Sequence, residues 1–208
     1  MSRVIRGASD LAEGAAHLAR ICPVWARTLP ILGPLPLRRW DEGFCSIRDA
    51  VVSQQISTSA AAAILGRMAE AGLDSEAGIR GASDEALRAA GLSRPKARYL
   101  RGIVEAGVDW PGLRDLDDEA AIARLVALPG IGRWTAEIYL KFALGRADVF
   151  ASADLALAEA ARLLYDLPER PAPKALAVLA EPWRPWRAVA ARALWAYYRH
   201  AKDREGIR

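Results

Sequence analysis

The sequence is poor in the residues that build disulfide frameworks, zinc sites and β-sheets. Its two cysteines, Cys22 and Cys45, form no CxxC pair, and its two histidines, His17 and His200, lie towards opposite ends of the chain. This pattern excludes a disulfide framework, argues against a histidine-based zinc site and suits a reducing compartment. Valine, isoleucine and threonine form no alternating run of strand length, so the composition favours helices.

Signal segments and membrane spans are also missing. No charged-then-apolar leader is present, and no apolar run reaches the ~18 residues of a membrane helix. The 208 residues carry 29 basic and 25 acidic side chains, a net charge of +4. This balance is compatible with a nucleic-acid partner but does not identify one. We therefore expect a soluble monomer of the cytoplasm, in the bacterial cytosol or nucleoid, that makes no membrane contact.

The chain contains about ten short helical segments, separated by glycine, proline and capping residues. Residues 30–37 hold three prolines and a glycine, so we expect a linker and no helix interior there. Besides the helices of the motif described next, the expected helices span about 10–20, 24–29, 44–54, 60–71, 83–91, 93–106, 155–165, 174–180 and 186–202, with a single turn at 75–79.

The stretch from 120 to 157 carries the strongest functional signal. An apolar helical run meets a tight turn at 128–132, and a second helix starts at once. Glycines in such a turn let another molecule approach the backbone, and the following helix N-terminus attracts phosphate. The same turn is otherwise an ordinary packing device. The predicted phosphate-binding residues are Gly130, Ile131, Gly132, Arg133 and Thr135.

Four segments in order resemble the helix-hairpin-helix DNA glycosylase superfamily, and most of all its DNA-3-methyladenine glycosylase II branch. They are LPGIGRWTAE (128–137) with Asp154 behind it, VVSQQIS (51–57), GLSRPKARYL (91–100) and WRPWRAVAARALW (183–195). The resemblance implies an all-α fold of two helical lobes, one at 41–150 with the hairpin and one formed by 1–40 and 151–208. Some relatives hold an iron–sulfur cluster on four cysteines near the C-terminus. This chain has no cysteine after Cys45, so we expect no cluster.

The resemblance also implies base excision, in which a damaged nucleotide is flipped out of double-stranded DNA and its N-glycosidic bond is cleaved. Asp154 matches the family's catalytic aspartate. A carboxylate there stabilises an oxocarbenium-like sugar and orients or deprotonates the attacking water. The alternative reading of Asp154 is a helix N-cap, because an apolar helix follows it, and one residue can serve both purposes.

The base pocket implied by the resemblance contains Trp134, Trp195 and Ile138. Indole faces attract a cationic base by stacking and cation–π forces worth ~0.5–2 kcal/mol each, although a helix tryptophan is often simply core. Bifunctional relatives carry a lysine at the position of Trp134, which forms a Schiff base with the sugar. We therefore predict a monofunctional enzyme. Ile138 stands where the branch can carry a tyrosine, and Tyr139 is expected to point elsewhere.

Further positions are assigned by resemblance as well. Gln55, with Gln54 beside it, matches the residue that wedges into the gap left by the flipped base; the alternative is a solvated turn between helices. The hairpin carbonyls of Val126, Leu128 and Ile131 would hold a structural Na⁺ or K⁺, and no other cofactor is expected.

Three basic residues of the segment 91–100, Arg94, Lys96 and Arg98, either contact phosphates or are merely solvated. Arg187 either orients Asp154 or braces the lobes, and the sequence leaves that choice open.

The leading hypothesis is hydrolytic release of alkylated purines of the 3-methyladenine type from duplex DNA. A first alternative keeps the scaffold but changes the lesion to deaminated or etheno purines. A second alternative is a non-enzymatic DNA-binding protein that uses the hairpin for phosphate contacts. Asp154 distinguishes these classes, because a carboxylate beside DNA repels phosphate and benefits only an enzyme.

Overall fold

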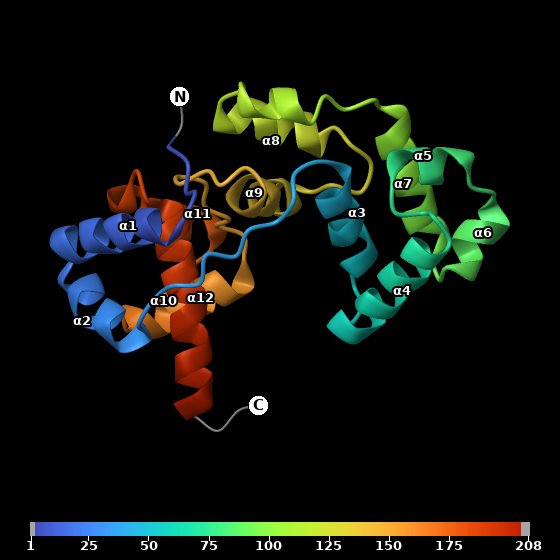
Figure 1. Ribbon diagram of the computed structural model, residues 1–208. Coiled ribbons are helices and arrows are strands. Elements are labelled where there is room, and N and C mark those ends of the chain that lie inside the picture. Colours follow the sequence, from blue (N-terminus) through green and yellow to red (C-terminus); the bar gives the residue numbers. More distant parts are fainter. Residues whose placement is uncertain (1–2, 205–208) are drawn as a thin grey trace. The chain divides into compact units, whose positions relative to one another are not determined.

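The computed structural model describes residues 3–204, and in that range it is built from twelve α-helices and two short 3-10 helices (Figure 1). Pairing of the β type within this range is limited to an isolated bridge between Val4 and Arg146. The all-α prediction is confirmed. By contacts the chain divides into unit 1, residues 1–39 and 140–208, and unit 2, residues 40–139. The lobe limits inferred from the family resemblance remain a prediction.

Unit 1 is assembled around its last helix. Its elements are α1 (Ala8–Ile21), α2 (Pro23–Leu32), α10 (Leu155–Leu164), α11 (Pro173–Ala180), a 3-10 turn (Glu181–Trp183) and α12 (Arg187–Arg204). The helix α12 packs against α1, α2 and α10. Four fully buried alanines, at 188, 190, 191 and 193, give it a narrow surface that neighbouring helices can approach closely.

A cluster of aromatic rings fills the core of unit 1 beside these alanines. Trp183 meets Trp25 edge-on at 5.4 Å between ring centroids, and Phe150 at 5.8 Å. Tyr165 stacks on the same indole at 6.2 Å, and burial raises the pKa of Tyr165 well above its ordinary value. Large rings in contact bury much apolar area, so this cluster is a main source of stability for the unit.

Unit 2 contains the remaining helices. They are α3 (Phe44–Ser53), α4 (Thr58–Glu70), α5 (Glu76–Gly81), α6 (Asp84–Ala89), α7 (Arg94–Glu105), a 3-10 turn (Pro111–Arg114), α8 (Asp118–Val126) and the first part of α9 (Arg133–Phe142), within which the boundary falls. Helix α7 packs against α3, α5 and α6. It is therefore the central support of this unit.

Side-chain caps start several of these helices where the sequence predicts them. The hydroxyl of Ser57 accepts the N–H of Ala60, and Ser83 does the same for Ala86. At α8 the carboxylate of Asp117 accepts the N–H of Ala120 at 2.8 Å. Each bond satisfies a backbone donor that the helix itself leaves without a partner, which fixes the first turn.

Several predicted helix bounds are shifted by one to three residues, and two of these differences have a clear physical cause. Helix α2 continues to Leu32 with Pro30 in its last turn. Proline at this position removes only one intrahelical hydrogen bond. The burial of Trp25 and Leu29 stabilises the helix enough to offset that loss. Helix α1 starts at Ala8, ahead of the expected start at about residue 10. Asp10 caps from inside the first turn by accepting the N–H of Arg6 at 2.7 Å and of Gly7 at 3.0 Å. These bonds lower the pKa of Asp10.

Membrane insertion finds no support in these helices. Of those lying between residues 3 and 204, none combines the length and the apolar character that crossing a bilayer requires.

Two helical glycines allow a matched test of the packing. A Cβ on Gly14 would lie 2.6 Å from Val189 and 2.9 Å from the Trp186 ring, whereas a Cβ on Gly66 would meet nothing within 4 Å. We expect Gly14→Ala to lower the free energy of unfolding by about 1–3 kcal/mol through overpacking. Gly66→Ala should instead raise it by about 0.5–1 kcal/mol, because alanine favours the helix. Urea unfolding measures both, and equal effects would contradict the close contact of α1 with α12.

Candidate active site

The hairpin turn lies in unit 2 between the end of α8 at Val126 and the start of α9 at Arg133. Two backbone hydrogen bonds shape it, from Leu128 N–H to Leu125 at 3.0 Å and from Ile131 N–H to Leu128 at 3.2 Å. The first hydrogen bond of α9 runs from Ala136 N–H to the carbonyl of Gly132. The N–H groups of residues 133–135 therefore precede the helical ladder, at the positive end of the helix dipole.

The two glycines of the turn serve different purposes. Gly130 has φ of 77°, and a Cβ there would lie 2.4 Å from the ring of Tyr99. The protein's own packing thus requires glycine at 130. A Cβ on Gly132 would meet nothing within 4 Å, and this residue is exposed. Nothing described inside the chain requires glycine at 132, which fits a close approach by another molecule.

Arg133 does not present an unpaired positive charge. Its guanidinium donates two hydrogen bonds to Glu119, at 2.7 and 3.0 Å, and one to Glu137 at 2.9 Å. The hydrogen bond with Glu119 raises the pKa of Arg133. Because two carboxylates already surround this cation, attraction of a phosphate here rests mainly on backbone N–H groups and the helix dipole.

The other predicted phosphate-binding residues show mixed burial. Ile131 and Thr135 are buried, whereas Gly132 and Arg133 are exposed. Thr135 is the third residue of α9, so its backbone belongs to the helix N-terminus even though its side chain is covered. A phosphate contact at 131 or 135 would therefore use main-chain groups.

The cation site inferred from the resemblance remains a prediction, and the structure describes the surroundings of two of its carbonyls. Val126 ends α8 and Leu128 follows it closely, so their carbonyls lie at the negative end of that helix dipole. The carbonyl of Leu128 already accepts one N–H, from Ile131, and a carbonyl oxygen keeps a second lone pair. Within residues 3–204 the acidic, cysteine and histidine side chains form no group of three that could hold a metal ion.

The two wedge candidates behave differently. Gln54 donates from its amide to the carbonyl of Gly130 at 2.9 Å, which ties it to the hairpin turn. Gln55 is exposed and has φ of 60°, a left-handed conformation that is uncommon outside glycine. Gln55 is thus placed for an external contact, and Gln54 is engaged within the protein.

Asp154 lies in unit 1, at the end of the loop between α9 and α10. Its Oδ1 accepts the N–H of Ala156 at 2.9 Å and of Leu157 at 3.0 Å. The residue is therefore the N-cap of α10, and its side chain is half-buried. The capping interpretation is confirmed, and it leaves the catalytic one standing because a cap fixes the carboxylate in one orientation.

Arg187 fastens the loop that leads to Asp154 through contacts that lie within unit 1. Arg187 contacts both carboxylate oxygens of Asp148, at 2.9 and 3.1 Å, and donates to Glu181 at 3.0 Å. Arg184 donates to the same Asp148 at 2.6 Å. Asp148 lies six residues before Asp154, so this paired arrangement fixes the path of the loop.

The base-pocket candidates are distributed over both units. In unit 2, Trp134 is 46% exposed at the start of α9, and Ile138 is buried one turn later. In unit 1, Trp195 stacks on Phe142 with 5.7 Å between ring centroids. Tyr139 is engaged within unit 2: its hydroxyl accepts the N–H of Gly43, and burial raises the pKa of Tyr139.

Sequence reasoning missed Lys141 as a neighbour of the candidate pocket. Its side chain is fully buried in unit 1, and its ammonium lies 4.5 Å from the ring centroid of Trp195 and 6.0 Å from that of Phe150. This is a cation–π arrangement. The available signal was a single charge inside the apolar run IYLKFAL at 138–144. Tyr99 was missed as well, since its contact with Gly130 depends on tertiary packing.

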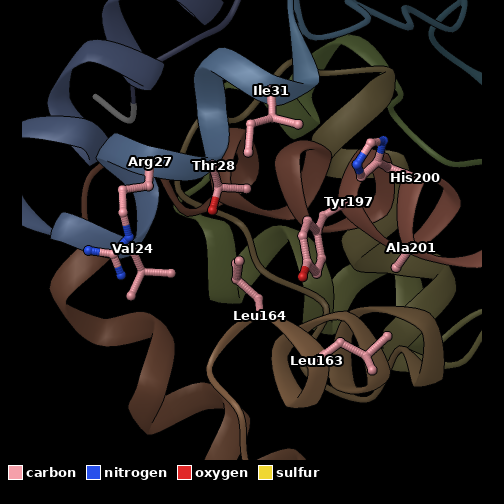
Figure 2. Close-up of a pocket in the computed structure, with 9 residues that line it drawn as sticks. All are labelled: Val24, Arg27, Thr28, Ile31, Leu163, Leu164, Tyr197, His200 and Ala201. Carbon is pink, nitrogen blue, oxygen red and sulfur yellow. The ribbon is translucent and has the colours of Figure 1, made fainter. Parts of the chain in front are cut away.

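A separate cavity of about 640 Å³ lies within unit 1. Figure 2 shows side chains from α2, α10 and α12 converging on it, among them Thr28, Leu164 and Tyr197. None of its nine lining residues belongs to the predicted site. The catalytic hypothesis therefore rests on Asp154 and the hairpin, with no role for this cavity.

Comparison with known proteins gives consistent matches. Residues 49–185 match the model of the HhH-GPD superfamily base excision DNA repair proteins. DNA-3-methyladenine glycosylase 1 of Schizosaccharomyces pombe is 32% identical over 199 residues, covering 90% of this chain and 87% of the relative.

Solved structures agree. A DNA-3-methyladenine glycosidase from Bacillus halodurans superposes with a TM-score of 0.85 at 32% identity, covering 96% of this chain and 95% of the other. The S. pombe 3-methyladenine DNA glycosylase in complex with abasic DNA gives a TM-score of 0.75 at 32% identity, over 88% and 95% of the two chains.

The two hairpin glycines provide a matched pair of substitutions. Gly130→Ala forces a left-handed alanine against Tyr99, so we expect it to destabilise the protein by about 1–3 kcal/mol. Gly132→Ala has room and should change the free energy of unfolding by less than about 0.5 kcal/mol. If the backbone at 132 is where a phosphate approaches, Gly132→Ala should nevertheless weaken binding of duplex DNA. Denaturant titration and fluorescence anisotropy measure the two effects, and unaltered DNA binding would refute that assignment.

Proposed function

The chain belongs to the HhH-GPD superfamily of base excision DNA repair proteins, and on this premise we propose that it is a monofunctional DNA glycosylase releasing alkylated purines of the 3-methyladenine type from duplex DNA. The observation that carries the proposal is the capped carboxylate of Asp154, which follows the hairpin inside the region that matches the family. Identity of 32% over most of the chain to a 3-methyladenine glycosylase supports this substrate class.

The proposed reaction needs one carboxylate and one water. The alkylated purine is already cationic, so it leaves as a neutral base when the glycosidic bond breaks and takes the bonding electrons with it. The negative charge of Asp154 stabilises the oxocarbenium-like sugar that remains. Water then forms a bond to C1′ and loses a proton through Asp154, which leaves an abasic site. The two hydrogen bonds that Asp154 accepts from backbone N–H groups hold the orientation of its carboxylate during the reaction.

Binding of DNA in this proposal divides among three elements. The N-terminus of α9 and the uncovered backbone at Gly132 hold a phosphate, and the carbonyls of the hairpin would hold a monovalent cation, which supplies positive charge beside that phosphate. Gln55 fills the gap left by the flipped nucleotide. The absence of an amine at 134, where Trp134 stands, explains why strand cleavage through a Schiff base is not part of the reaction.

Substitution of Asp154 separates chemistry from folding. Asn caps a helix about as well as Asp, so Asp154→Asn should keep the free energy of unfolding, whereas Asp154→Ala should lose about 1 kcal/mol. Both should reduce base release from methylated duplex DNA by about 100-fold or more, because both remove the charge. Chromatography of released bases measures the activity, and calorimetry or denaturant unfolding measures the stability.

Three results would contradict parts of this proposal. If the wild type releases no base from a panel of alkylated, deaminated and etheno lesions, the glycosylase proposal fails. A fully active Asp154→Asn variant would remove the catalytic role from that residue. Borohydride trapping of a protein–DNA adduct would show that the enzyme is not monofunctional.

One observation favours a second candidate, the release of neutral lesions such as deaminated or etheno purines. The ammonium of Lys141 lies against the indole of Trp195 at 4.5 Å. A cation there already interacts with the negative face of the ring, and it repels a second cation nearby. The indole would thus attract a cationic base less strongly than it would without Lys141, and neutral purines would compete better.

Lys141→Met tests this effect. We expect the ratio of cationic to neutral base release to rise by about 3- to 10-fold, because a cation–π contact contributes ~1 kcal/mol. Lys202→Met is the control, because it removes the same charge from the same unit. The ammonium of Lys202 lies 4.6 Å from the ring centroid of Tyr198. Competition between 7-methylguanine and hypoxanthine in otherwise identical duplexes gives the ratio. An unaltered ratio in Lys141→Met would leave only the alkylpurine proposal.

A further inference from the structure

We infer that Gln54 and Lys96 are positioning residues that hold Gln55 in its exposed conformation and couple it to the hairpin turn. The inference rests on the proposed function, because it gives Gln55 the gap-filling role. It adds that the gap-filling residue and the phosphate-binding turn form one preset structure within unit 2. Neither Gln54 nor Lys96 needs to touch DNA for this purpose.

The conformation of Gln55 needs support. Its φ of 60° is sparsely populated by residues other than glycine, and its side chain is exposed. Such a conformation persists only where the surroundings determine it. The residues on either side of Gln55 should therefore be held by specific contacts, and two such contacts are present.

The first contact comes from α7. The ammonium of Lys96 donates to the carbonyl of Val52 at 2.6 Å, at the last turn of α3. A cation at a helix C-terminus interacts favourably with the exposed carbonyls and with the dipole. Partial burial lowers the pKa of Lys96, in keeping with a side chain that points into the protein. Lys96 thus fixes where α3 ends, and Gln54 and Gln55 follow directly.

The second contact comes from the hairpin. Gln54 donates to the carbonyl of Gly130 at 2.9 Å across 76 residues of sequence. The side chain of Gln54 points towards the hairpin, whereas the side chain of its neighbour Gln55 is exposed to solvent. The two glutamines of the QQ pair therefore have separate tasks, one inside and one outside.

Helix α7 supports both contacts with one face. Lys96, Tyr99 and Gly102 are spaced by three residues, so they share that face. Tyr99 packs against Gly130, where a Cβ would lie 2.4 Å from its ring. Gly102 lies so close to Pro129 that a Cβ there would be 2.7 Å from Cγ. The face thus contacts the end of α3 and the hairpin turn at the same time.

Loss of these contacts should affect gap filling and phosphate binding differently. Breaking either contact lets Gln55 relax to an ordinary backbone conformation, which removes gap filling. The N–H groups of α9 that hold phosphate are unaffected, because neither contact involves them. Discrimination between a duplex with a gap and an intact duplex should therefore fall, while affinity for the intact duplex remains.

The experiment compares two duplexes of equal sequence, one intact and one with a tetrahydrofuran abasic-site analogue. Gln54→Met keeps the length of the side chain but has no donor for the carbonyl and adds no charge, and Lys96→Met removes the ammonium. We expect each to weaken binding of the abasic duplex by about 10-fold, the effect of one lost hydrogen bond to a buried or charged group, and of the intact duplex by less than about twofold. Lys96→Arg retains a donor and should restore discrimination.

Arg94→Met is the matched control. It removes one exposed positive charge from the same helix, so any effect should fall on both duplexes equally. A merely structural role for Gln54 or Lys96 would lower both affinities together, with no rescue by Lys96→Arg, and would overturn the inference. So would a wild type that does not distinguish the two duplexes.

Failure of the proposed function gives a different pattern. The inference would be retained if the wild type prefers the abasic duplex, Gln54→Met and Lys96→Met lose that preference, and yet no base is released from any lesion. The glycosylase activity alone would then be excluded.

Discussion

The contact between Tyr99 and Gly130 is the constraint on which the rest of unit 2 depends. A side chain at 130 cannot coexist with the ring of Tyr99, and only glycine adopts the left-handed backbone there without strain. This contact fixes the turn against α7. The position of the turn then determines where α9 begins and where the Gly130 carbonyl, which accepts the hydrogen bond from Gln54, points. The position of the α9 N-terminus, to which we assign phosphate binding, and that of the residue pair with Gln55 therefore both depend on one close packing interaction.

Unit 1 solves a different problem, which is to hold one carboxylate still at the end of a loop. Asp154 receives two N–H groups from α10, and Asp148 is held by Arg184 and Arg187 from the region before and within α12. The N–H of Ala188 also donates to the loop, at the carbonyl of Ala147. A loop fastened at its middle and its end has little freedom to move, so the carboxylate is preorganised. Preorganised charge stabilises a transition state without reorganisation during the reaction.

Local chemistry in the sequence was enough to predict the helical fold and most helix starts, because caps such as Ser57, Ser83 and Asp117 act within four residues. Features that depend on distant residues could not be predicted in this way. The pairing of Arg133 with Glu119 and the tie between Gln54 and Gly130 join residues that are 14 and 76 positions apart. Likewise, the low helix propensity of proline predicts a helix end at Pro30, but the burial of neighbouring side chains outweighs the lost hydrogen bond and the helix continues.

The neutralisation of Arg133 changes the account of how this protein would bind DNA. A free arginine at the turn would contribute a salt-sensitive ionic attraction, whereas backbone N–H groups bind phosphate through short, directional hydrogen bonds. Glu119 and Glu137 both pair with this guanidinium, so its positive charge is largely balanced before a phosphate approaches. The turn is therefore selective for geometry more than for charge. That property suits a protein that must examine many intact base pairs weakly and hold tightly only where a nucleotide can leave the stack.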